Sequence, residues 1–317
     1  MTTASRRSAT SALRAEPWGH LDDGRPVHRW TLRNAQGMRV DIAELGGSLL
    51  SWLAPDRHGR LGEVLLGHDS LAQYARDKSY MGALIGRWGN RIRDGRFTLD
   101  GVEYRLDRND RGHHLHGGEE GFHQAVWQAD TEGEALLLRL RSPDGEGGFP
   151  GNLDVQVRYR LHDDGSLGID YEARSDLPTP INLTSHPYFN LSGGRGSIGD
   201  HLLRIDAEDF LAVDAGTIPA AQEGVAGTPF DFRNPAPLGA RLAWPHPQLS
   251  IAGGFDHCYC LGESRGKPRL VADAYDPSSG RRLSVITDQP GLQLYTGQHL
   301  GGVPARVLRE GITWSKD

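Results

Sequence analysis

The sequence predicts an all-β sandwich, and three observations support this prediction. Apolar and polar residues alternate along several short segments, which is typical of strands that bury one face. Glycine and proline, with 42 and 18 residues, separate these segments and supply the turns between them. Helical periodicity is confined to short segments such as Ser70–Arg76. Many short strands with frequent turns indicate a sandwich rather than an α/β fold.

The clearest strands are expected in three segments that follow Trp30. Apolar and polar residues alternate in Arg39–Leu45, Leu136–Arg141 and Leu153–Leu161. Glycine-rich segments at Asp144–Gly151 and Asp163–Gly165 are predicted to form turns.

The strands are expected to form a single domain. A length of 317 residues permits two domains, but all-β sandwiches of about 200–250 residues occur as single units. No internal repeat or linker divides residues 18–317. Residues 1–17 are rich in Ser, Thr, Ala and Arg without an apolar region, so a disordered tail is expected there and not a secretion signal.

Composition and charge exclude several classes of protein. The formal net charge is −6, and the arginines are scattered rather than clustered, so no nucleic-acid partner is expected. No apolar run approaches the ~20 residues that span a bilayer, so no membrane segment is expected. Cys258 and Cys260 are the only cysteines. They are expected to be reduced strand residues that hold no metal, which is consistent with a cytoplasmic protein.

The segment Ile181–Leu191, INLTSHPYFNL, combines strand-forming residues with short polar ones and one ionisable ring, that of His186. We expect a buried strand that ends at a functional site, because imidazole can give or take a proton near neutral pH. The alternative is a core histidine that hydrogen-bonds to the backbone.

This segment resembles the signature of the aldose 1-epimerases, or galactose mutarotases. Four further segments resemble that family in the same order: GALIGRWGNRI (Gly82–Ile92), HLHGGEEGF (His114–Phe122), FDHCYCL (Phe255–Leu261) and QPGLQLYTG (Gln289–Gly297). The resemblance extends from about Trp30 to about Gly302. It implies a large twisted antiparallel β-sandwich of the galactose mutarotase type, a supersandwich, with a sugar cleft on a concave sheet face.

The resemblance also implies a role for individual residues in opening and reclosing a sugar ring. His186 matches the acid that protonates the ring oxygen, and His116 matches a second histidine that binds near the same oxygen. The substrate-binding residues are then Asn90, Arg91, His116, His186, Tyr188, Asp256 and Gln293. His257 is expected behind the site, and the candidate aromatic walls, each of which could equally be core, are Trp88, Trp127, Tyr188 and Phe189.

The residue types at these positions suit that chemistry. Arg and Asn offer a planar fork and an amide for sugar hydroxyls. Gly117 and Gly118 after His116, and Gly86 and Gly89 before Asn90, would let the backbone approach a ligand; otherwise His116 is an ordinary turn residue.

A metal triad of His113, His114 and His116 lacks a carboxylate at ligand spacing. Acid–base assistance of about 10²–10⁴ fold requires no metal and no cofactor, so neither is expected.

The resemblance ends before the family's catalytic base, a Glu in a later strand. At family spacing that position falls at or just past Asp317, so the C-terminal part is expected to be shortened. A direct alignment of the end places Ser315 there, and Glu310 is the nearest carboxylate. Two alternatives to an active aldose 1-epimerase therefore stay open: a carbohydrate-binding or inactive homologue, and a hexose-phosphate epimerase, which would need further cationic residues. We expect a monomer or weak homodimer.

Overall fold

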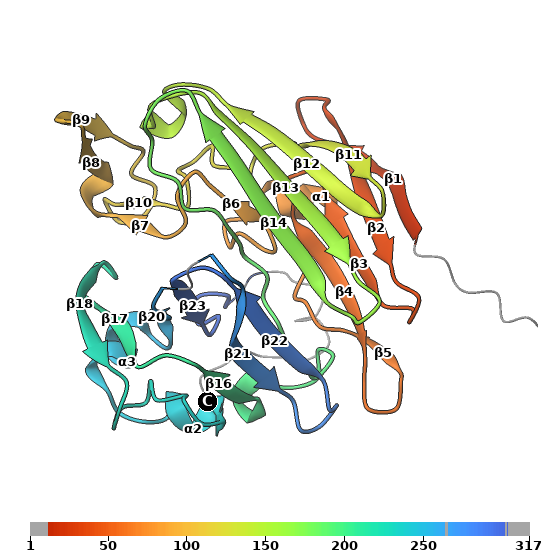
Figure 1. Cartoon of the computed structure of the whole chain (residues 1–317), viewed down its shortest axis with the longest axis vertical. Helices are drawn as coiled ribbons and strands as arrows, with labels where there is room; N and C mark the ends of the chain where they lie inside the picture. Colours follow the sequence, from red (N-terminus) through yellow and green to blue (C-terminus); the bar gives the residue numbers. More distant parts are fainter. Residues whose placement is uncertain (1–11, 264–265, 302, 304–317) are drawn as a thin grey trace, which may run out of the picture. The chain divides into compact units, whose positions relative to one another are not determined.

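The computed structural model describes residues 12–263, 266–301 and 303 of the chain, and most of its regular structure is antiparallel strand (Figure 1). The all-β prediction is therefore confirmed. The chain divides into two compact units: unit 1 comprises Met1–Ala54 and Leu65–Tyr188, and unit 2 comprises Pro55–Val64 and Phe189–Asp317. The single-domain organisation of residues 18–317 stays a prediction. No helix among the described residues is long and apolar enough to cross a membrane.

Unit 1 holds most of the strands. They are β1 (Ala12–His20), β2 (Pro26–Arg33), β3 (Arg39–Ala43), β4 (Leu49–Pro55), β6 (Leu84–Ile85), β7 (Arg91–Ile92), β8 (Arg96–Leu99), β9 (Val102–Arg105), β10 (His114–Leu115), β11 (Gln128–Glu132), β12 (Ala135–Ser142), β13 (Leu153–Leu161), β14 (Leu167–Ser175) and β15 (Thr184–Ser185). Its helical turns are α1 (Leu71–Ala75), η1 (Arg93–Gly95) and η2 (Glu146–Gly148). Strands β1 to β4 are neighbours in one sheet and β11 to β14 in another, and the pairs β6–β15, β7–β10 and β8–β9 form small ribbons.

The core of unit 1 lies between its two larger sheets. On β13, Val155, Val157 and Tyr159 are each at most 1% exposed, while the residues between them face outward. The Tyr159 hydroxyl donates to the Gly47 carbonyl 3.0 Å away. The apolar residues that alternate in the sequence thus form the buried face of this strand. The strand has the bounds of the predicted segment, Leu153–Leu161.

The predicted helical segment Ser70–Arg76 is also confirmed. Ser70 is the N-cap of α1: its hydroxyl accepts from the Gln73 N–H, and the Gln73 side chain accepts from the Ser70 N–H. This reciprocal capping box satisfies two backbone donors that the first turn would leave unpaired.

The prediction of a disordered tail is wrong for Ala12–Pro17. These residues belong to β1, which pairs with β2 in the register Leu13↔Leu32, Ala15↔Trp30 and Pro17↔His28. Backbone pairing to a neighbouring strand orders a segment whose composition carries no strand signal of its own. The rest of the predicted tail, residues 1–11, lies outside the described residues.

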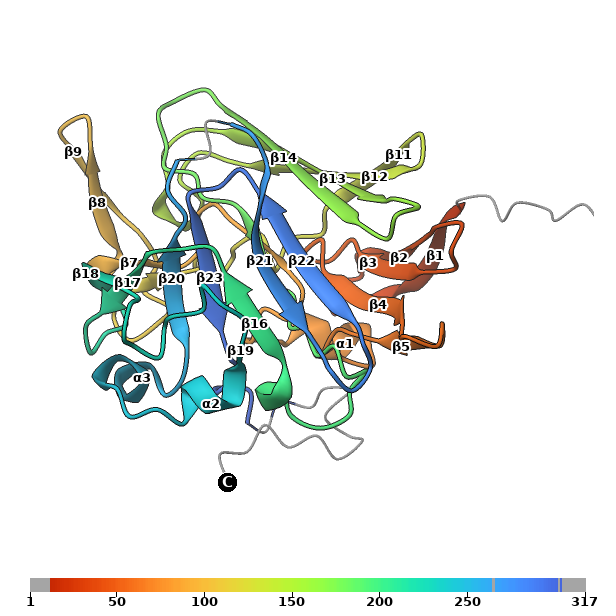
Figure 2. The ribbon, with the colours of Figure 1, turned by 60° about the horizontal axis from the view of Figure 1, so that its bottom comes forward.

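Unit 2 contains the remaining elements. They are β5 (Leu61–Glu63), β16 (Leu202–Ile205), β17 (Asp209–Val213), β18 (Pro219–Gly224), β19 (Ala236–Pro237), β20 (Asp256–Cys260), β21 (Arg269–Tyr275), β22 (Arg282–Thr287) and β23 (Gly291–Tyr295), with η3 (Ile198–Asp200), α2 (Leu238–Leu242) and α3 (Pro247–Ala252). Two four-stranded sheets form, in the orders β19-β16-β21-β22 and β18-β17-β20-β23 (Figure 2).

One aromatic cluster joins the two sheets of unit 2. Phe210 of β17 and Tyr259 of β20 are buried in the same cluster as Ile205 of β16 and Val271 of β21. Phe210 also stacks on Phe230, with ring centroids 3.9 Å apart. Unit 2 is therefore a small sandwich with its own hydrophobic core.

A buried arginine ties the loops of unit 1 together. The guanidinium of Arg87, a residue only 2% exposed, donates to the carbonyls of Ser142, Pro143 and Pro150 at 3.0, 2.8 and 2.9 Å. Its Nε donates to the Ser142 hydroxyl at 2.8 Å. Burial lowers its pKa, while the charge of Glu146 acts in the opposite direction. Arg87 therefore links the start of the GRWGNRI segment to the loop after β12.

We expect Arg87→Met to lower the free energy of unfolding by about 3 kcal/mol or more, because each buried carbonyl left without a donor costs about 1–3 kcal/mol. The carbonyls of Ser142, Pro143 and Pro150 would lose their donor, and methionine could only fill the space. Urea unfolding measures the change. Arg105→Met is the matched control, because the Arg105 side chain is 82% exposed, and it should leave the midpoint unchanged. Equal midpoints for the two variants would contradict the structural role of Arg87.

Candidate active site

The segment Ile181–Leu191 is not the buried strand expected from its composition. Only Thr184 and Ser185 form a strand, β15, and they pair with Ile85 and Leu84 of β6. Residues 181–189 are partly or fully exposed, whereas Asn190 and Leu191 are buried. The short polar side chains and Pro187 restrict the ladder, since proline has no N–H to donate.

His186 follows β15 directly, and its main chain is held on both sides. Its N–H donates to the Ala83 carbonyl at 2.9 Å, and its carbonyl accepts from the Gly82 N–H at 3.0 Å. The ring therefore extends from a fixed point of the backbone.

His116 follows β10, which pairs with β7 so that Leu115 lies opposite Arg91. The Asn109 side chain accepts from the Leu115 N–H and donates to its carbonyl, both at 2.8 Å. This amide fixes the backbone just before His116.

Two hydrogen bonds join His116 to Asn90. The His116 N–H donates to the Asn90 carbonyl at 3.3 Å, and the Asn90 N–H donates to Nδ1 of the His116 ring at 2.9 Å. Because Nδ1 accepts a backbone proton, the neutral ring carries its own proton on Nε2. The pKa of His116 lies well below its ordinary value, because the ring is buried and faces the charges of His186 and Arg91. Near neutral pH, His116 is a neutral ring that donates from Nε2.

The rings of His116 and His186 lie close together. Their centroids are 5.2 Å apart and their planes are nearly perpendicular. Tyr188 packs 5.1 Å from His186, which is consistent with its predicted place at the site. The Tyr188 hydroxyl donates to the Ser79 carbonyl at 2.9 Å.

Tyr80 and His123 complete this cluster, and the sequence analysis missed both. The Tyr80 ring centroid lies 4.7 Å from that of His116, 4.7 Å from that of His123 and 5.9 Å from that of His186. The carboxylate of Asp77 shapes the loop, because it accepts from the Ser79 and Met81 N–H groups. Burial raises the pKa of Tyr80 to about 12 and lowers that of His123 to about 4.

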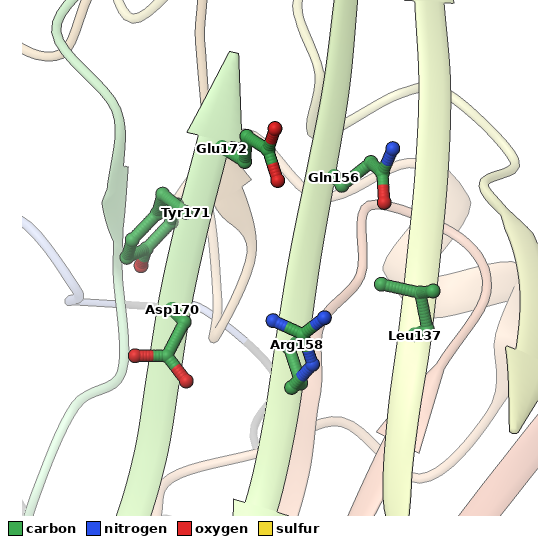
Figure 3. A pocket seen from close by; sticks show the side chains of 6 residues that line it. All are labelled: Leu137, Gln156, Arg158, Asp170, Tyr171 and Glu172. Atoms are coloured by element: carbon green, nitrogen blue, oxygen red, sulfur yellow. The ribbon is translucent and has the colours of Figure 1, made fainter. Parts of the chain in front are cut away.

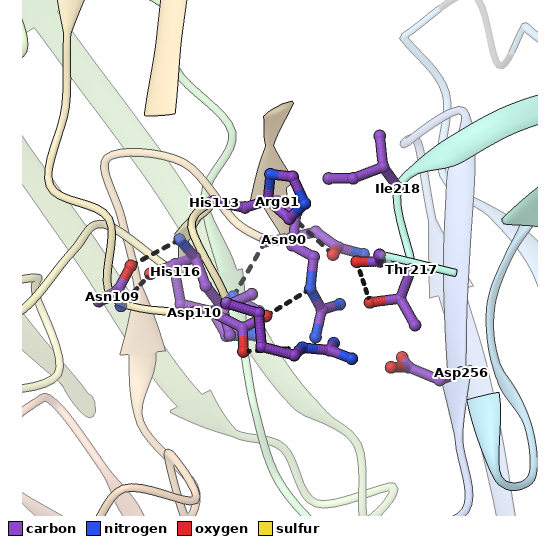
Figure 4. A network of polar contacts seen from close by, with 12 residues as sticks. Asn90, Arg91, Asn109, Asp110, His113, His116, Thr217, Ile218 and Asp256 are labelled. Carbon is purple, nitrogen blue, oxygen red and sulfur yellow. Dashed lines mark hydrogen bonds and ion pairs between the residues drawn. The ribbon is translucent and has the colours of Figure 1, made fainter. Parts of the chain in front are cut away.

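Arg91 extends from β7 and is held by a carboxylate. Its Nε donates to Oδ2 of Asp110 at 2.7 Å (Figure 4). The Asn90 side-chain oxygen accepts from the Arg91 N–H at 2.9 Å. Unit 1 thus brings together Asn90, Arg91, His116 and His186, four of the residues that the resemblance selects.

The glycines around this group are packed closely against other parts of the protein. A Cβ on Gly117 would lie 1.8 Å from the Gly86 carbonyl oxygen, and one on Gly86 would lie 2.1 Å from the Phe122 ring. A Cβ on Gly89 would approach Thr184, and one on Gly118 would meet Asp107. Close internal packing therefore accounts for glycine at these positions, and the approach of their backbone to a ligand stays a prediction.

Asp256 and Gln293 meet in unit 2. Asp256 begins β20 and Gln293 lies on the neighbouring β23, opposite Cys258. The Gln293 amide donates to Oδ1 of Asp256 at 2.8 Å. The pair presents a carboxylate and an amide oxygen on one strand face.

His257 lies on the opposite face of β20 and supports Asp256 from behind. It is 0% exposed, and its Nδ1 accepts from the Asp256 N–H at 3.1 Å. Its Nε2 lies 3.1 Å from Oε1 of Gln248 on α3. Gln248 in turn accepts from the Val213 N–H and donates to the Val213 carbonyl of β17. The predicted place of His257 behind the site is consistent with this arrangement.

The histidines of the metal hypothesis serve separate structural purposes. His113 Nδ1 accepts from the Asp94 N–H at 3.0 Å. His114 is 0% exposed, with Nδ1 3.0 Å from the Asp107 carbonyl. Within the described residues, no group of three or more His, Cys, Asp or Glu is arranged to hold a metal ion.

The aromatic candidates separate into core and site. Trp127 is 1% exposed, packs 5.7 Å from Phe122 and donates to the Phe122 carbonyl, so it is core. Trp88 is partly buried and bridges to Asn182, and Phe189 is partly buried at the start of the segment assigned to unit 2. The Tyr188 ring lies against the ring of His186.

A shallow hollow of about 250 Å³ lies on another part of unit 1 (Figure 3). It is lined by Leu137, Gln156, Arg158, Asp170, Tyr171 and Glu172 of β12 to β14. Arg158 pairs with Glu132 at 2.6 Å. Charges of both signs on one exposed strand face are typical of a solvated surface, and none of the predicted site residues lies there.

Glu310 and Ser315, the sequence candidates for the position of the base, lie outside the described residues.

Comparison with known proteins identifies relatives over most of the chain. The family model described as aldose 1-epimerase matches residues 28–316. The galactose mutarotase of Bos taurus is 43% identical over 278 residues, which cover 87% of this chain and 79% of that one. The aldose 1-epimerase of Escherichia coli (strain K12) is 38% identical over 294 residues, which cover 92% of this chain and 85% of that one. The crystal structure of galactose 1-epimerase from Lactobacillus acidophilus NCFM superposes with a TM-score of 0.81 at 30% identity, covering 92% of this chain and 84% of that one.

Buried histidines should make stability depend on pH. Burial, with a smaller effect of the His246 charge, lowers the pKa of His257 to about 4. The unfolded chain, with a histidine pKa of about 6.5, binds more protons below that pH. The contribution of His257 to the free energy of unfolding is therefore fully present above about pH 6.5. It decreases by about 3 kcal/mol as the pH drops to 4.

Urea unfolding at several pH values tests this expectation. His257→Asn keeps an acceptor for the Asp256 N–H but cannot titrate, so its stability should fall less than that of the unmodified protein between pH 6.5 and 4. His58→Asn, at an exposed position, is the control. Identical slopes for all three proteins would exclude His257 as a source of the pH dependence.

Proposed function

The chain belongs to the aldose 1-epimerase family, and on this basis we propose that it interconverts the α and β anomers of free hexoses of the galactose and glucose type. The reaction opens the cyclic hemiacetal and closes it on the other face. It needs a proton acceptor for the anomeric hydroxyl and a proton donor for the ring oxygen.

The perpendicular contact between His116 and His186 carries this proposal. Two imidazoles 5.2 Å apart, beside Arg91 and Asn90, can present two N–H donors to one oxygen atom. Their main chains are fixed by hydrogen bonds to Asn90, Gly82 and Ala83. Such preorganised donors stabilise the charge that develops when the ring opens.

The two histidines receive different roles. His116 donates from Nε2 and stays neutral, because a proton on Nδ1 would face the Asn90 N–H. His186 is the acid: it protonates the ring oxygen as the carbon–oxygen bond breaks and recovers that proton when the ring recloses. Glu310 and Ser315 stay the sequence candidates for the position of the base.

Hydroxyl recognition is assigned to the remaining predicted residues. Arg91 and Asn90 bind sugar hydroxyls from β7, and Tyr188 provides a wall beside His186. Asp256 accepts hydrogen bonds from sugar hydroxyls, with Gln293 holding its carboxylate. An uncharged sugar is a better ligand for Arg91 than a sugar phosphate, because Asp110 already balances the charge of this side chain.

We further propose that the protein acts in the cytoplasm, as a monomer or weak homodimer, without a metal or cofactor. Free thiols at Cys258 and Cys260 support the location.

Binding measurements test the substrate class. Galactose and glucose should each bind saturably in calorimetry, with dissociation constants no weaker than tens of millimolar, and their 6-phosphates should bind more weakly. The reason is that Arg91 already pairs with Asp110, so little cationic charge is left to attract a phosphate. Tighter binding of the phosphates would favour the hexose-phosphate alternative, and no saturable binding of any of these sugars would exclude the proposal.

Glutamine substitutions should separate the roles of the two histidines. Glutamine can donate a hydrogen bond but cannot cycle a proton. We expect His186→Gln to lower kcat about 10²–10⁴ fold with a smaller change in sugar affinity. His116→Gln, which keeps a donor, should cost about tenfold or less, the value of one ordinary hydrogen bond.

Polarimetry on freshly dissolved α-anomer at one low buffer concentration measures both rates. A strong chelator should leave the rate of the unmodified protein unchanged. If the unmodified protein binds sugar without accelerating mutarotation, it is a binding homologue. If His186→Gln keeps nearly full activity while His116→Gln loses it, the roles are reversed.

A further inference from the structure

The carboxylate of Asp110 is placed against Arg91 by a short turn of unit 1. Asp110 and His113 exchange backbone hydrogen bonds of 3.1 and 2.8 Å. The two residues between them, Arg111 and Gly112, have φ values of 48° and 86°. Positive φ at both central positions matches a type I′ turn, the tightest hairpin connection. We refer to Asp110–His113 as the Asp110 turn.

The Asp110 turn is fastened to the segment that carries Arg91 at both of its ends. At its first residue, Oδ2 of Asp110 accepts from Nε of Arg91 at 2.7 Å (Figure 4). At its last residue, the His113 ring accepts from the Asp94 N–H at 3.0 Å. The following strand β10 then pairs Leu115 with Arg91. Both the backbone and the side chain of Arg91 are therefore held by one short stretch of chain.

The ion pair is sheltered enough to hold its geometry. The side chains of Arg91 and Asp110 are only 12% and 21% exposed. Burial alone would raise the pKa of Asp110, but the hydrogen bond from Arg91 and the charges of Arg91 and Arg111 hold it below the usual range. Asp110 therefore stays ionised near neutral pH. The second arginine, Arg111, is 55% exposed, and its Nε lies 3.4 Å from Oδ1.

We infer that Asp110 is a positioning residue for sugar binding: its carboxylate fixes the guanidinium of Arg91 in the orientation in which Arg91 meets the sugar hydroxyls. An unrestrained arginine loses much side-chain freedom when it binds a ligand. Because the Asp110 turn already restrains the Arg91 side chain in the free protein, less conformational entropy is lost when a sugar binds. The inference rests on the proposed role of Arg91 in sugar recognition.

Asp110→Ala should therefore weaken galactose binding and raise KM about 3- to 10-fold, the cost of ordering one long side chain. Its kcat should change less than its KM, because Arg91, the side chain that Asp110 holds, is proposed to bind sugar hydroxyls and not to carry the proton. Asp110→Asn keeps one acceptor oxygen for Arg91 and should recover part of the affinity. Asp130→Asn is the matched control: it removes a carboxylate of the same unit that lies 3.3 Å from an arginine, Arg139, and is 61% exposed, and it should bind galactose as the unmodified protein does.

A double-mutant cycle distinguishes positioning from general stability. In the Arg91→Ala background, Asp110→Ala should cause no further loss of galactose affinity, because the side chain that it positions is gone. Full additivity of the two losses, or unchanged affinity in Asp110→Ala alone, would overturn the inference and leave the proposed function in place. Unchanged affinity in Arg91→Ala would overturn both. Thermal unfolding of each variant shows whether it is folded, and if Asp110→Ala is not, Asp110→Asn enters the cycle in its place.

Discussion

The hydrogen bond from the Asn90 backbone to Nδ1 of His116 is the contact on which the arrangement of the candidate site in unit 1 depends. It brings two segments together that are separated by 26 positions, and it decides which nitrogen of His116 carries the proton. A hydroxyl or amide oxygen in place of Nδ1 could also accept the hydrogen bond from the Asn90 N–H. It could not carry an N–H donor on the opposite side of a rigid ring, as His116 does at Nε2. The same bond places Arg91 beside the histidines, because Arg91 is the next residue. The position of Arg91 and the protonation state of His116 thus both follow from this one hydrogen bond.

The GRWGNRI segment shows how two similar side chains serve different purposes. Arg87 is enclosed, and several carbonyls satisfy its donors, so it holds loops together. Arg91, four residues later, is paired on one side by Asp110. A buried arginine without acceptors would cost several kcal/mol, which explains why so many carbonyls converge on Arg87. The sequence contains both arginines in one motif, and only their surroundings separate the structural from the proposed binding role.

The sequence predicted those features that depend on local periodicity or local chemistry. The strand Leu153–Leu161 alternates because one face is buried, and α1 begins at a recognisable capping box. Ala12–Pro17 was missed because its order comes from β2. Ile181–Leu191 was assigned too much strand because its pairing is interrupted: β15 pairs with β6, and Asn182 forms an isolated bridge with Trp88. In the candidate site, the family resemblance selected His116 and His186. Tyr80, His123 and Asp110 were missed because they act through ring contacts and an ion pair with distant residues. The one available signal was the turn sequence after Asp110.

Backbone strain in the described part of the chain concentrates around the same group of residues. Non-glycine residues with positive φ include Tyr80, Asn90, Asp94, Arg111 and His116, at 57°, 72°, 55°, 48° and 54°. Each such conformation is unfavourable for a residue with a Cβ and persists only where surrounding contacts enforce it. The contacts are present: Asp77 shapes the loop of Tyr80, Asn90 and His116 bond to each other, and His113 holds Asp94. Because a relaxed backbone would separate these side chains, the strain is best understood as the cost of holding two imidazoles and one guanidinium together at the proposed sugar site.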